Sequence, residues 1–405
     1  MHTTPHEYAR SVTIAAVPTC DLRGGVHDGK SVAEYFAGMG LMRMGLERAG
    51  WHTVFANDID AKKLELYTGH YGDSGGLFVL GDVHALAPDQ VPTTTLATAS
   101  FPCTDLSLAG ARGGLHSGGS AAFWGFARML ELMEARRPPL VLLENVVGFL
   151  TSKGGADLRE AIQCLNALGY AVDALVVDAA HFVPQSRQRM FIVGANVQRR
   201  SADRVADRDL FGGSVVRPPA LMDFIFRNGD LHWDIRDMPN PPTRRLNLAD
   251  ILEDLPASAL EWWSDDRAAY LLDQMSERHR ALASAMIGAP TVTYGTVFRR
   301  VRQGQCMAEL RTDGVAGCLR TPRGGSGRQI LFRAGHGQYR TRLLTPRECA
   351  RLMGADDYVV NVPLNQALFG FGDAVCVPVV EWVATHCLEP RYRELIDVST
   401  YAYRA

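Results

Sequence analysis

Apolar residues form two alternating kinds of segment from Ser31 onward. Short runs rich in β-branched and aromatic residues are followed by longer stretches with helical spacing. The runs that predict strands lie at Ser31–Phe36, Thr53–Asn57, Leu77–Leu80, Thr95–Ala99, Leu140–Leu143, Ala171–Val177 and Met190–Val193. The stretches that predict helices lie at Met39–Ala49, from Asp60, at Ala121–Ala135 and at Leu158–Leu168. Strands that alternate with helices predict an α/β fold around a parallel, doubly wound sheet.

The pattern becomes irregular after Gly194. Residues 199–290 mix charges, prolines and tryptophans, and residues 291–343 are rich in Gly and Arg with short β-like pieces. Further helices are expected at Leu248–Leu255, Arg267–Ile287, Pro346–Met353 and Val375–Cys387. The parts expected are a loose tail at 1–29, a first domain at 30–197, a smaller second domain at 198–343 and a segment at 344–405 that returns to the first domain.

Length and charge narrow the class of protein. The chain has 405 residues, 47% of them hydrophobic, and roughly 100–200 residues per domain predict two or three domains. A net charge of −2 excludes a globally basic nucleic-acid binder, so any such footprint must be local. Residues 298–342 carry ten arginines against two acidic residues. A solvated charged face is the ordinary interpretation, but the interleaved glycines favour loops that enter a DNA groove.

Cysteine usage and hydropathy bear on metal and membrane binding. Eight cysteines are scattered along the chain, and none forms a CxxC pair or a Cys/His cluster with zinc spacing. We therefore expect reduced thiols and no bound metal. The N-terminus lacks the apolar core of a signal peptide, and the apolar runs are shorter than the roughly 20 residues of a membrane span. These features predict a cytoplasmic protein with no membrane association.

Glycines and carboxylates follow the first three predicted strands. Residues 36–40 (FAGMG) form a Gly-rich turn that lets a ligand approach the backbone. Asp58 ends the second strand, 20 residues after Gly38, where an acid can bind the ribose hydroxyls of a nucleoside. Asp82 follows the third strand and could accept a hydrogen bond from an adenine amino group. A tight turn would explain the glycines alone, but three such features at consecutive strand tips predict a nucleoside-cofactor site.

Two reactive side chains follow the next strands. A lone cysteine is usually a small buried hydrophobe. Cys103, however, follows the rigid Pro102 at a strand tip and precedes a Gly-rich loop, which is typical of a nucleophile. Glu144 ends the neighbouring strand, and a carboxylate that caps the next helix is its ordinary interpretation. Its place beside the Cys103 strand favours a joint role.

These features occur in the order seen in the DNA (cytosine-5) methyltransferase family, which the chain resembles over about residues 31–390. The matching motifs are Phe36-x-Gly38-x-Gly40, Pro102-Cys103, Glu144-Asn145-Val146, Gln185-x-Arg187-x-Arg189, residues 344–354 (LTPRECARLMG) and Gly372-Asp373-Ala374-Val375. The resemblance implies a Rossmann-like, S-adenosylmethionine-dependent methyltransferase sheet in the catalytic domain at 30–197. It also implies that 198–343 is a target-recognition domain.

The resemblance further implies the chemistry. Cys103 would attack C6 of a flipped-out cytosine, Glu144 would donate at N3, and Arg187 would bond O2. Arg189 would support the site or contact phosphate. The cofactor would be S-adenosyl-L-methionine, leaving S-adenosyl-L-homocysteine, with no metal. The implied cofactor residues are Phe36, Gly38, Gly40, Asp58, Ile59, Asp82, Val83, Pro102, Ala374 and Val375.

The implied partner is double-stranded DNA, methylated at a specific sequence. We expect DNA contacts from Ser107, Arg320, Arg323 and Arg328, and a Gly-rich loop at 110–119 that closes over the substrate. Restriction-modification or host defence is the expected setting, a separate cognate restriction endonuclease is a candidate partner, and a monomer is the expected state.

Two residues depart from the family pattern, and two other functions compete. Asp373 stands where Asn is usual, and Glu34 stands where Asp is common. One alternative is a tRNA cytosine-5 methyltransferase, since a eukaryotic branch of the family modifies RNA. The other is a non-catalytic DNA-binding regulator on the same scaffold. The Arg/Gly-rich region favours DNA, and intact Cys103, Glu144 and Arg187 argue against a regulator.

Overall fold

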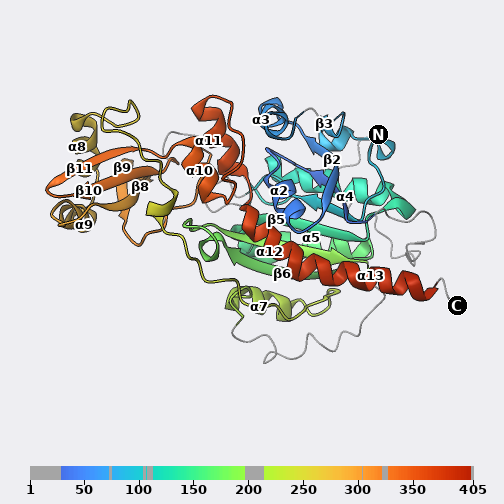
Figure 1. The fold of residues 1–405 in the computed structure, drawn as a ribbon. Coiled ribbons are helices and arrows are strands. Elements are labelled where there is room, and N and C mark those ends of the chain that lie inside the picture. The colour runs from blue at the N-terminus through green and yellow to red at the C-terminus, as the bar shows by residue number, and fades with distance from the viewer. Residues whose placement is uncertain are drawn as a thin grey trace.

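The computed structural model describes residues 29–72, 75–103, 106, 113–196, 214–302, 304–321 and 327–402, which form two β-sheets (Figure 1). The larger sheet has seven strands in the order β3-β2-β1-β4-β5-β7-β6. They are β1 (Ser31–Tyr35), β2 (His52–Asp58), β3 (Phe78–Leu80), β4 (Leu96–Ala99), β5 (Leu140–Val146), β6 (Ala171–Asp178) and β7 (Gln188–Ala195). Each strand predicted for the first domain is present, and the predicted α/β fold is confirmed.

The direction of β7 differs from the prediction. The pairs β1–β2, β1–β4, β2–β3 and β4–β5 are parallel, but β7 is antiparallel to both β5 and β6. Apolar periodicity marks a buried strand without encoding its direction. In addition, β5 continues through Glu144 and Asn145, where the sequence predicted its end, because both polar side chains are buried beside neighbouring strands.

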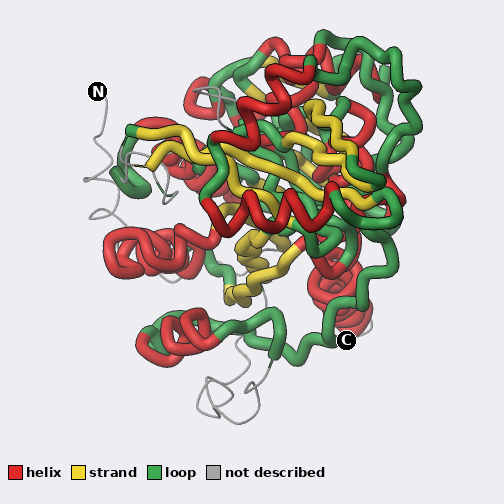
Figure 2. The backbone as a smooth tube through the Cα atoms, turned by 90° about the vertical axis from the view of Figure 1, so that its left-hand side faces the viewer, coloured by secondary structure: helices red, strands yellow, loops and turns green. Residues whose placement is uncertain are grey.

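Helices cover both faces of the large sheet (Figure 2). They include α2 (Leu41–Arg48), α3 (Ala61–Tyr71), α4 (Ala122–Leu132), α5 (Ala156–Ala167) and α12 (Val377–Val383). Leu96 packs in a core with α2 and α12, whereas the adjacent Ala97 packs in the core that contains α4 and α5. Successive residues therefore face opposite layers, and because both layers are apolar the strands read as continuous hydrophobic runs.

The smaller sheet is antiparallel, in the order β11-β10-β8-β9. Its strands are β8 (Thr293–Arg302), β9 (Gln305–Arg311), β10 (Ile330–Gly335) and β11 (Gln338–Leu343). Two helices, α8 (Asp265–Asp273) and α9 (Glu277–Ile287), share a separate core with it. The prediction of a single helix at Arg267–Ile287 was wrong, because residues 274–276 are not helical and separate two helices. The helix predicted at Leu248–Leu255 is only the 3-10 turn η8 (Leu248–Ile251).

Part of the segment that follows the expected domain boundary at 198 packs with the large sheet. Within residues 214–251, α7 (Pro219–Arg227) and η8 pack in the cores of the large sheet. The buried carboxylate of Asp173 on β6 lies 2.9 Å from a guanidinium nitrogen of Arg217 and 3.3 Å from one of Arg391. Only the later part of the predicted domain, from Trp263 to Leu343, has a core of its own.

The last segment lies between and beneath the two sheets (Figure 1). It contains α10 (Pro346–Leu352), α11 (Leu364–Asp373), and α12, which continues through the π turn η9 (Ala384–Leu388) into α13 (Glu389–Ala402). The run Leu364–Asp397 is long and apolar enough to cross a membrane by composition, but 72% of its most apolar window is buried inside the fold. Packing against α2 and the sheet accounts for this hydropathy.

Candidate active site

The strand order opens a crevice at the carboxyl end of the large sheet. The chain leads from β1 outward through β2 and β3 on one side, and from β4 through β5 on the other. Connections that leave adjacent strands in opposite directions create the space in which such sheets bind ligands. The residues that the sequence singled out at strand tips follow these five strands.

Asp58 fastens the Gly-rich turn to β2. Its carboxylate accepts hydrogen bonds of 2.9 Å from the main-chain N–H groups of Gly38 and Asp60. Gly40 has φ 84°, and a Cβ there would lie 2.5 Å from the ring of Tyr71, so glycine is required. The turn is thus held by one buried carboxylate and by close packing against α3.

Apolar side chains remain uncovered at the same edge. Phe36 has φ 56°, a left-handed conformation that costs about 1–3 kcal/mol and concentrates at ligand sites. Ile59 is 69% exposed. Asp82 is exposed and accepts a 2.9 Å hydrogen bond from the N–H of His84. Val83, by contrast, is buried in the core with α4, so its side chain faces away from this edge.

The loop that carries Cys103 is anchored through the two main-chain carbonyls that precede the cysteine. The amide of Asn145 donates to the carbonyl of Phe101 at 3.1 Å, and the hydroxyl of Ser120 donates to the carbonyl of Pro102 at 3.0 Å. The sequence placed Asn145 in a motif without giving it a role, and it did not identify Ser120. Buried polar residues beside a candidate nucleophile were the available signal, since such groups need partners.

Glu144 and Arg189 form an ion pair in the same place. Nε of Arg189 lies 3.0 Å from Oε1 of Glu144 across the β5–β7 ladder. Burial raises the pKa of the Glu144 carboxyl, although Arg189 and Arg187 oppose the shift. Burial also raises the pKa of the Cys103 thiol, while Arg189 lowers it. A carboxyl that holds its proton to higher pH therefore lies near a thiol whose ionisation the guanidinium favours.

Arg187 has a different environment. Its buried guanidinium donates to the carbonyl of Leu319 at 2.8 Å, to that of Gly372 at 3.2 Å, and to that of Ala374. These bonds join the residue before β7 to the recognition region and the end of α11. The sequence predicted Arg187 as the base-binding arginine and Arg189 as its support. In the structure, main-chain carbonyls engage Arg187, whereas Arg189 faces Glu144.

Cys318 is a second thiol at this junction, which the sequence missed. Nη1 of Arg187 lies 3.3 Å from its sulfur. Burial would raise the pKa of this thiol, but Arg187, Arg189 and Arg320 outweigh burial and lower it. A single cysteine in the recognition region carries no motif, and only the fold brings it to the two arginines.

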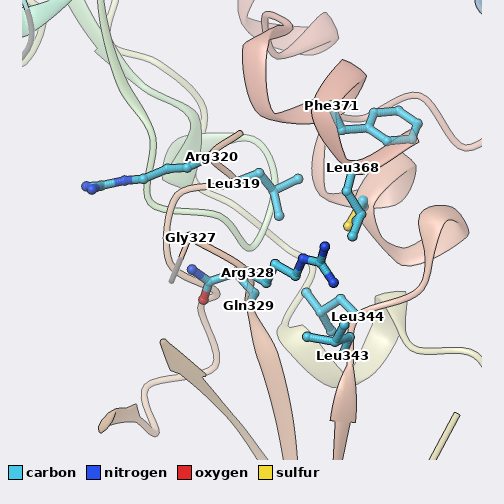
Figure 3. A pocket seen from close by; sticks show the side chains of 10 residues that line it. Leu319, Arg320, Gly327, Arg328, Gln329, Leu343, Leu344, Leu368 and Phe371 are labelled. Carbon is cyan, nitrogen blue, oxygen red and sulfur yellow. The ribbon is translucent and has the colours of Figure 1, made fainter. Parts of the chain in front are cut away.

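The arginines of the recognition region divide into internal and exposed groups. Arg342 is buried and donates to both oxygens of Glu348, at 2.6 and 2.7 Å. Arg328 turns toward α11, where it donates to Asn365 at 2.6 Å (Figure 3). A pocket beside α11 is lined by residues that include Leu319, Arg328 and Phe371. Arg320 also borders this pocket, but its side chain extends away from it and is exposed (Figure 3). Arg320 is therefore better placed than Arg328 to meet an external ligand.

The remaining predicted residues are placed as follows. Val375 is buried in the core with α2, and Pro102 is exposed beside Cys103. Ser107, Arg323 and the start of the predicted closing loop, 110–112, lie outside the described residues. Within the described ranges, no three His, Cys, Asp or Glu residues are grouped so that they could hold a metal ion.

Known proteins match nearly the whole chain. The family described as C-5 cytosine-specific DNA methylase matches residues 31–389. Type II methyltransferase M.HhaI of Haemophilus parahaemolyticus is 27% identical over 357 residues, which covers 87% of this chain and 92% of that protein. Type II methyltransferase M.NgoBI of Neisseria gonorrhoeae is 25% identical over 360 residues, again covering 87% and 92%.

Solved structures agree on the fold. The S. pombe Dnmt2 methyltransferase superposes with a TM-score of 0.58 at 20% identity and covers 89% of this chain and 98% of its own. The Entamoeba histolytica methyltransferase EhMeth gives a TM-score of 0.58 at 12% identity, covering 90% and 98%. The large sheet is thus the Rossmann-like sheet of S-adenosylmethionine-dependent methyltransferases. Because the family match spans residues 31–389, the chain belongs to the C-5 cytosine-specific DNA methylase family and is a DNA (cytosine-5) methyltransferase.

Proposed function

We propose that this enzyme methylates C5 of a flipped-out cytosine in duplex DNA through a covalent bond between Cys103 and C6. The observation that carries the proposal is the convergence of three groups from separate strand ends. The Cys103 thiol lies where its ionisation responds to Arg189 and Glu144, and those two residues form a 3.0 Å ion pair. Together they can present a nucleophile, a proton donor and a cation to one pyrimidine.

The carboxyl edge of β1, β2 and β3 fits S-adenosylmethionine. Exposed Ile59 and strained Phe36 offer apolar contact for an adenine, and the Asp58 carboxylate lies at the tip where ribose hydroxyls would bind. Gly38 and Gly40 leave room beside the turn, and Asp82 is available to the adenine amine. The carboxylates suit a nucleoside without phosphates. When bound, the cofactor supplies the methyl group that C5 accepts.

Each catalytic group has a defined task. The Cys103 thiolate adds to C6, and the electron pair of the C5=C6 bond then makes C5 nucleophilic. Glu144, whose burial favours the protonated form, donates to N3 and so makes C6 electrophilic. C5 takes the methyl group with S-adenosyl-L-homocysteine as the leaving group. A base then removes the C5 proton, Glu144 takes back the proton given to N3, the C5=C6 bond re-forms and Cys103 leaves as a thiolate.

Arg189 is the residue that we assign to O2 of the cytosine. Its side chain is next to Glu144, and both can address the same edge of the ring. Arg187 holds the surrounding backbone, since it bonds carbonyls on either side of Asp373 as well as Leu319. Ala374 therefore contributes to the junction through its carbonyl rather than through its methyl group.

Duplex DNA is the proposed substrate because exposed cations lie in the recognition region. The guanidinium of Arg267 stacks 3.8 Å from the centre of the Trp263 ring. Burial lowers the pKa of Arg267, and the nearby charges of Arg299 and Arg328 lower it further. Like charges held together favour an anionic ligand such as the DNA backbone. Arg320 would then contact DNA near the active site, with the base extruded at a cost of a few kcal/mol.

A trapping experiment tests the proposal. Duplex DNA with 5-fluorocytosine at the target should form a stable adduct with wild type in the presence of S-adenosylmethionine. Fluorine replaces the C5 proton whose removal is needed to release Cys103. The Cys103→Ala variant should form none. Bisulfite sequencing of DNA from an expressing host would first supply the target sequence. An undiminished adduct with Cys103→Ala would refute the assignment, and preferential modification of tRNA would move the substrate to RNA.

The biological setting follows from the relatives. M.HhaI and M.NgoBI are named Type II methyltransferases, so we propose a role in restriction-modification with a separate endonuclease as a candidate partner. A monomer is proposed for the active state. If sequencing finds one short sequence fully methylated, and that DNA resists a nuclease of the same specificity, the role is supported.

A further inference from the structure

Asp373, which departs from the family pattern, is paired with a lysine on the neighbouring helix α3. Oδ2 of Asp373 at the end of α11 lies 2.9 Å from Nζ of Lys63 on α3. The lysine side chain is 22% exposed and the aspartate 43%. The pair joins a segment near residue 60 to one near residue 370.

Lys63 also borders the cofactor edge. Its Cδ lies 3.8 Å from the position that a Cβ of Gly38 would occupy. Burial would lower the pKa of its ammonium, but Asp373, Asp58 and Asp60 outweigh burial and raise it. The lysine is therefore a charged group shared between the carboxylate at the ribose position and the one at the end of α11.

Other contacts hold α11 against the same part of α3. The amide of Gln366 donates to Glu65 at 2.7 Å and to the carbonyl of Lys62 at 3.1 Å. A Cβ on Gly370 would lie 2.8 Å from Leu66. These contacts hold the two helices that carry Lys63 and Asp373 against each other.

We propose that Lys63 and Asp373 act as a compensated pair of positioning residues for the cofactor, so that either charge without the other impairs binding. The inference rests on the proposed use of this edge for S-adenosylmethionine. Without Asp373, Lys63 is drawn to Asp58 and competes with the ribose hydroxyls. Without Lys63, Asp58, Asp60 and Asp373 repel one another across the turn. Removal of both charges leaves the neutral Asn that is usual in the family.

Calorimetric titration with S-adenosylhomocysteine tests this coupling. We expect Lys63→Ala and Asp373→Asn each to weaken binding about five- to tenfold, and the double variant to bind within about threefold of wild type. Lys62→Ala is the matched control, because Lys62 is exposed on the same helix, and it should bind like wild type. Thermal unfolding of each variant establishes that it is folded.

The Cys103 thiol gives a second readout, which a purely structural role would not produce. Burial raises the pKa of this thiol, Arg189 and Arg187 lower it, and Glu144 and Asp373 raise it. Asp373→Asn should therefore lower the pH midpoint of Cys103 alkylation by iodoacetamide, measured on the Cys103 peptide by mass spectrometry. Lys63→Ala should raise it, because the Asp373 carboxylate loses its counter-charge.

The outcomes separate the two proposals. If wild type does not bind S-adenosylhomocysteine, the proposed function fails and this inference fails with it. If wild type binds and the losses of the single variants multiply in the double variant, the proposed function stands and the pairing is refuted. Alkylation midpoints that move in the same direction in both single variants would also refute it.

Discussion

The carboxyl edge of the large sheet and the four-stranded recognition sheet both carry many charges, but they use them differently. At the edge, Asp58, Cys103 and Glu144 follow strands that end at one crevice, so sequence position also fixes their neighbours. In the recognition region, Arg342 is buried against Glu348 and Arg320 is exposed, although both belong to one basic stretch. A residue at a strand tip is informative by itself, whereas a local count of arginines does not separate structural from binding residues.

The largest effect, a loss of stability, should come from Arg342, a buried arginine of the recognition region that is not available to contact DNA. Arg342→Met leaves the buried carboxylate of Glu348 without its guanidinium, and breaking a buried pair in this way costs about 3–5 kcal/mol. Urea unfolding measures the loss. The control is Arg340→Met, an exposed residue whose guanidinium donates to the carbonyl of Ala257. Equal stabilities for the two variants would show that the internal and exposed groups are not distinct.

Replacement of Arg189 should mainly lower activity, whereas replacement of Arg187 should mainly lower stability. Loss of a donor that faces the reacting base costs about 10²–10³ in rate, or about 2.7–4 kcal/mol, so Arg189→Met should lower the single-turnover methylation rate by that factor. Since Arg189 lowers the pKa of Cys103, the variant should also shift thiol alkylation to higher pH. Arg187→Met should instead reduce the free energy of unfolding, because three carbonyls lose their donor. The opposite assignment of losses would restore the prediction made from the sequence.

The structural origin of that division lies in strand pairing. Glu144 is opposite Phe191 on β7, and Arg189 is two residues from Phe191, so Arg189 and Glu144 share one face. Arg187 precedes β7 and is free to turn toward α11. The motif predicted that both arginines matter. It could not predict which one faces Glu144, because the pairing of β5 with an antiparallel β7 is a property of the assembled sheet.

Other limits of the sequence have the same cause. The spacing from Gly38 to Asp58 and the Pro-Cys pair identified the crevice because each depends on residues near in sequence. The role of Asn145 was missed, as were Ser120 and Cys318, since their relevance depends on contacts made only in the folded chain. The interruption between α8 and α9 was also missed. The helical spacing of apolar residues continues across residues 274–276, but the backbone there is not helical.

Among exposed arginines, Arg320 should have the clearest effect on DNA. Arg320→Ala should weaken duplex binding about three- to tenfold and reduce the slope of log K against log salt by about 0.9. Binding of S-adenosylhomocysteine should not change, because the exposed side chain of Arg320 belongs to the recognition region and not to the edge of β1, β2 and β3 where the cofactor is proposed to bind (Figure 3). Fluorescence anisotropy at several salt concentrations measures both quantities. An unchanged salt slope would remove Arg320 from the DNA interface.

The smallest effect should come from Arg311, which belongs to the same basic stretch but is occupied by a neighbour. Nε of Arg311 lies 2.7 Å from Asp313, whose side chain is 54% exposed, so the pair contributes less than about 1 kcal/mol. Arg311 holds the pKa of Asp313 below its usual value. The contribution is therefore present above the unfolded pKa of about 3.9 and is lost as the pH falls through the folded pKa.

Arg311→Ala should consequently differ from wild type by under about 1 kcal/mol in urea unfolding at pH 7, and the difference should vanish in acid. Its salt slope for duplex binding should match that of wild type, because the neighbouring carboxylate already neutralises the guanidinium. Arg320 and Arg311 thus form a matched comparison: each contributes one positive charge to the same count, but of the two only Arg311 has a carboxylate within ion-pairing distance among the residues that the structure describes. Equal losses of DNA affinity in the two variants would mean that total charge, rather than the arrangement of side chains, governs binding in the recognition region.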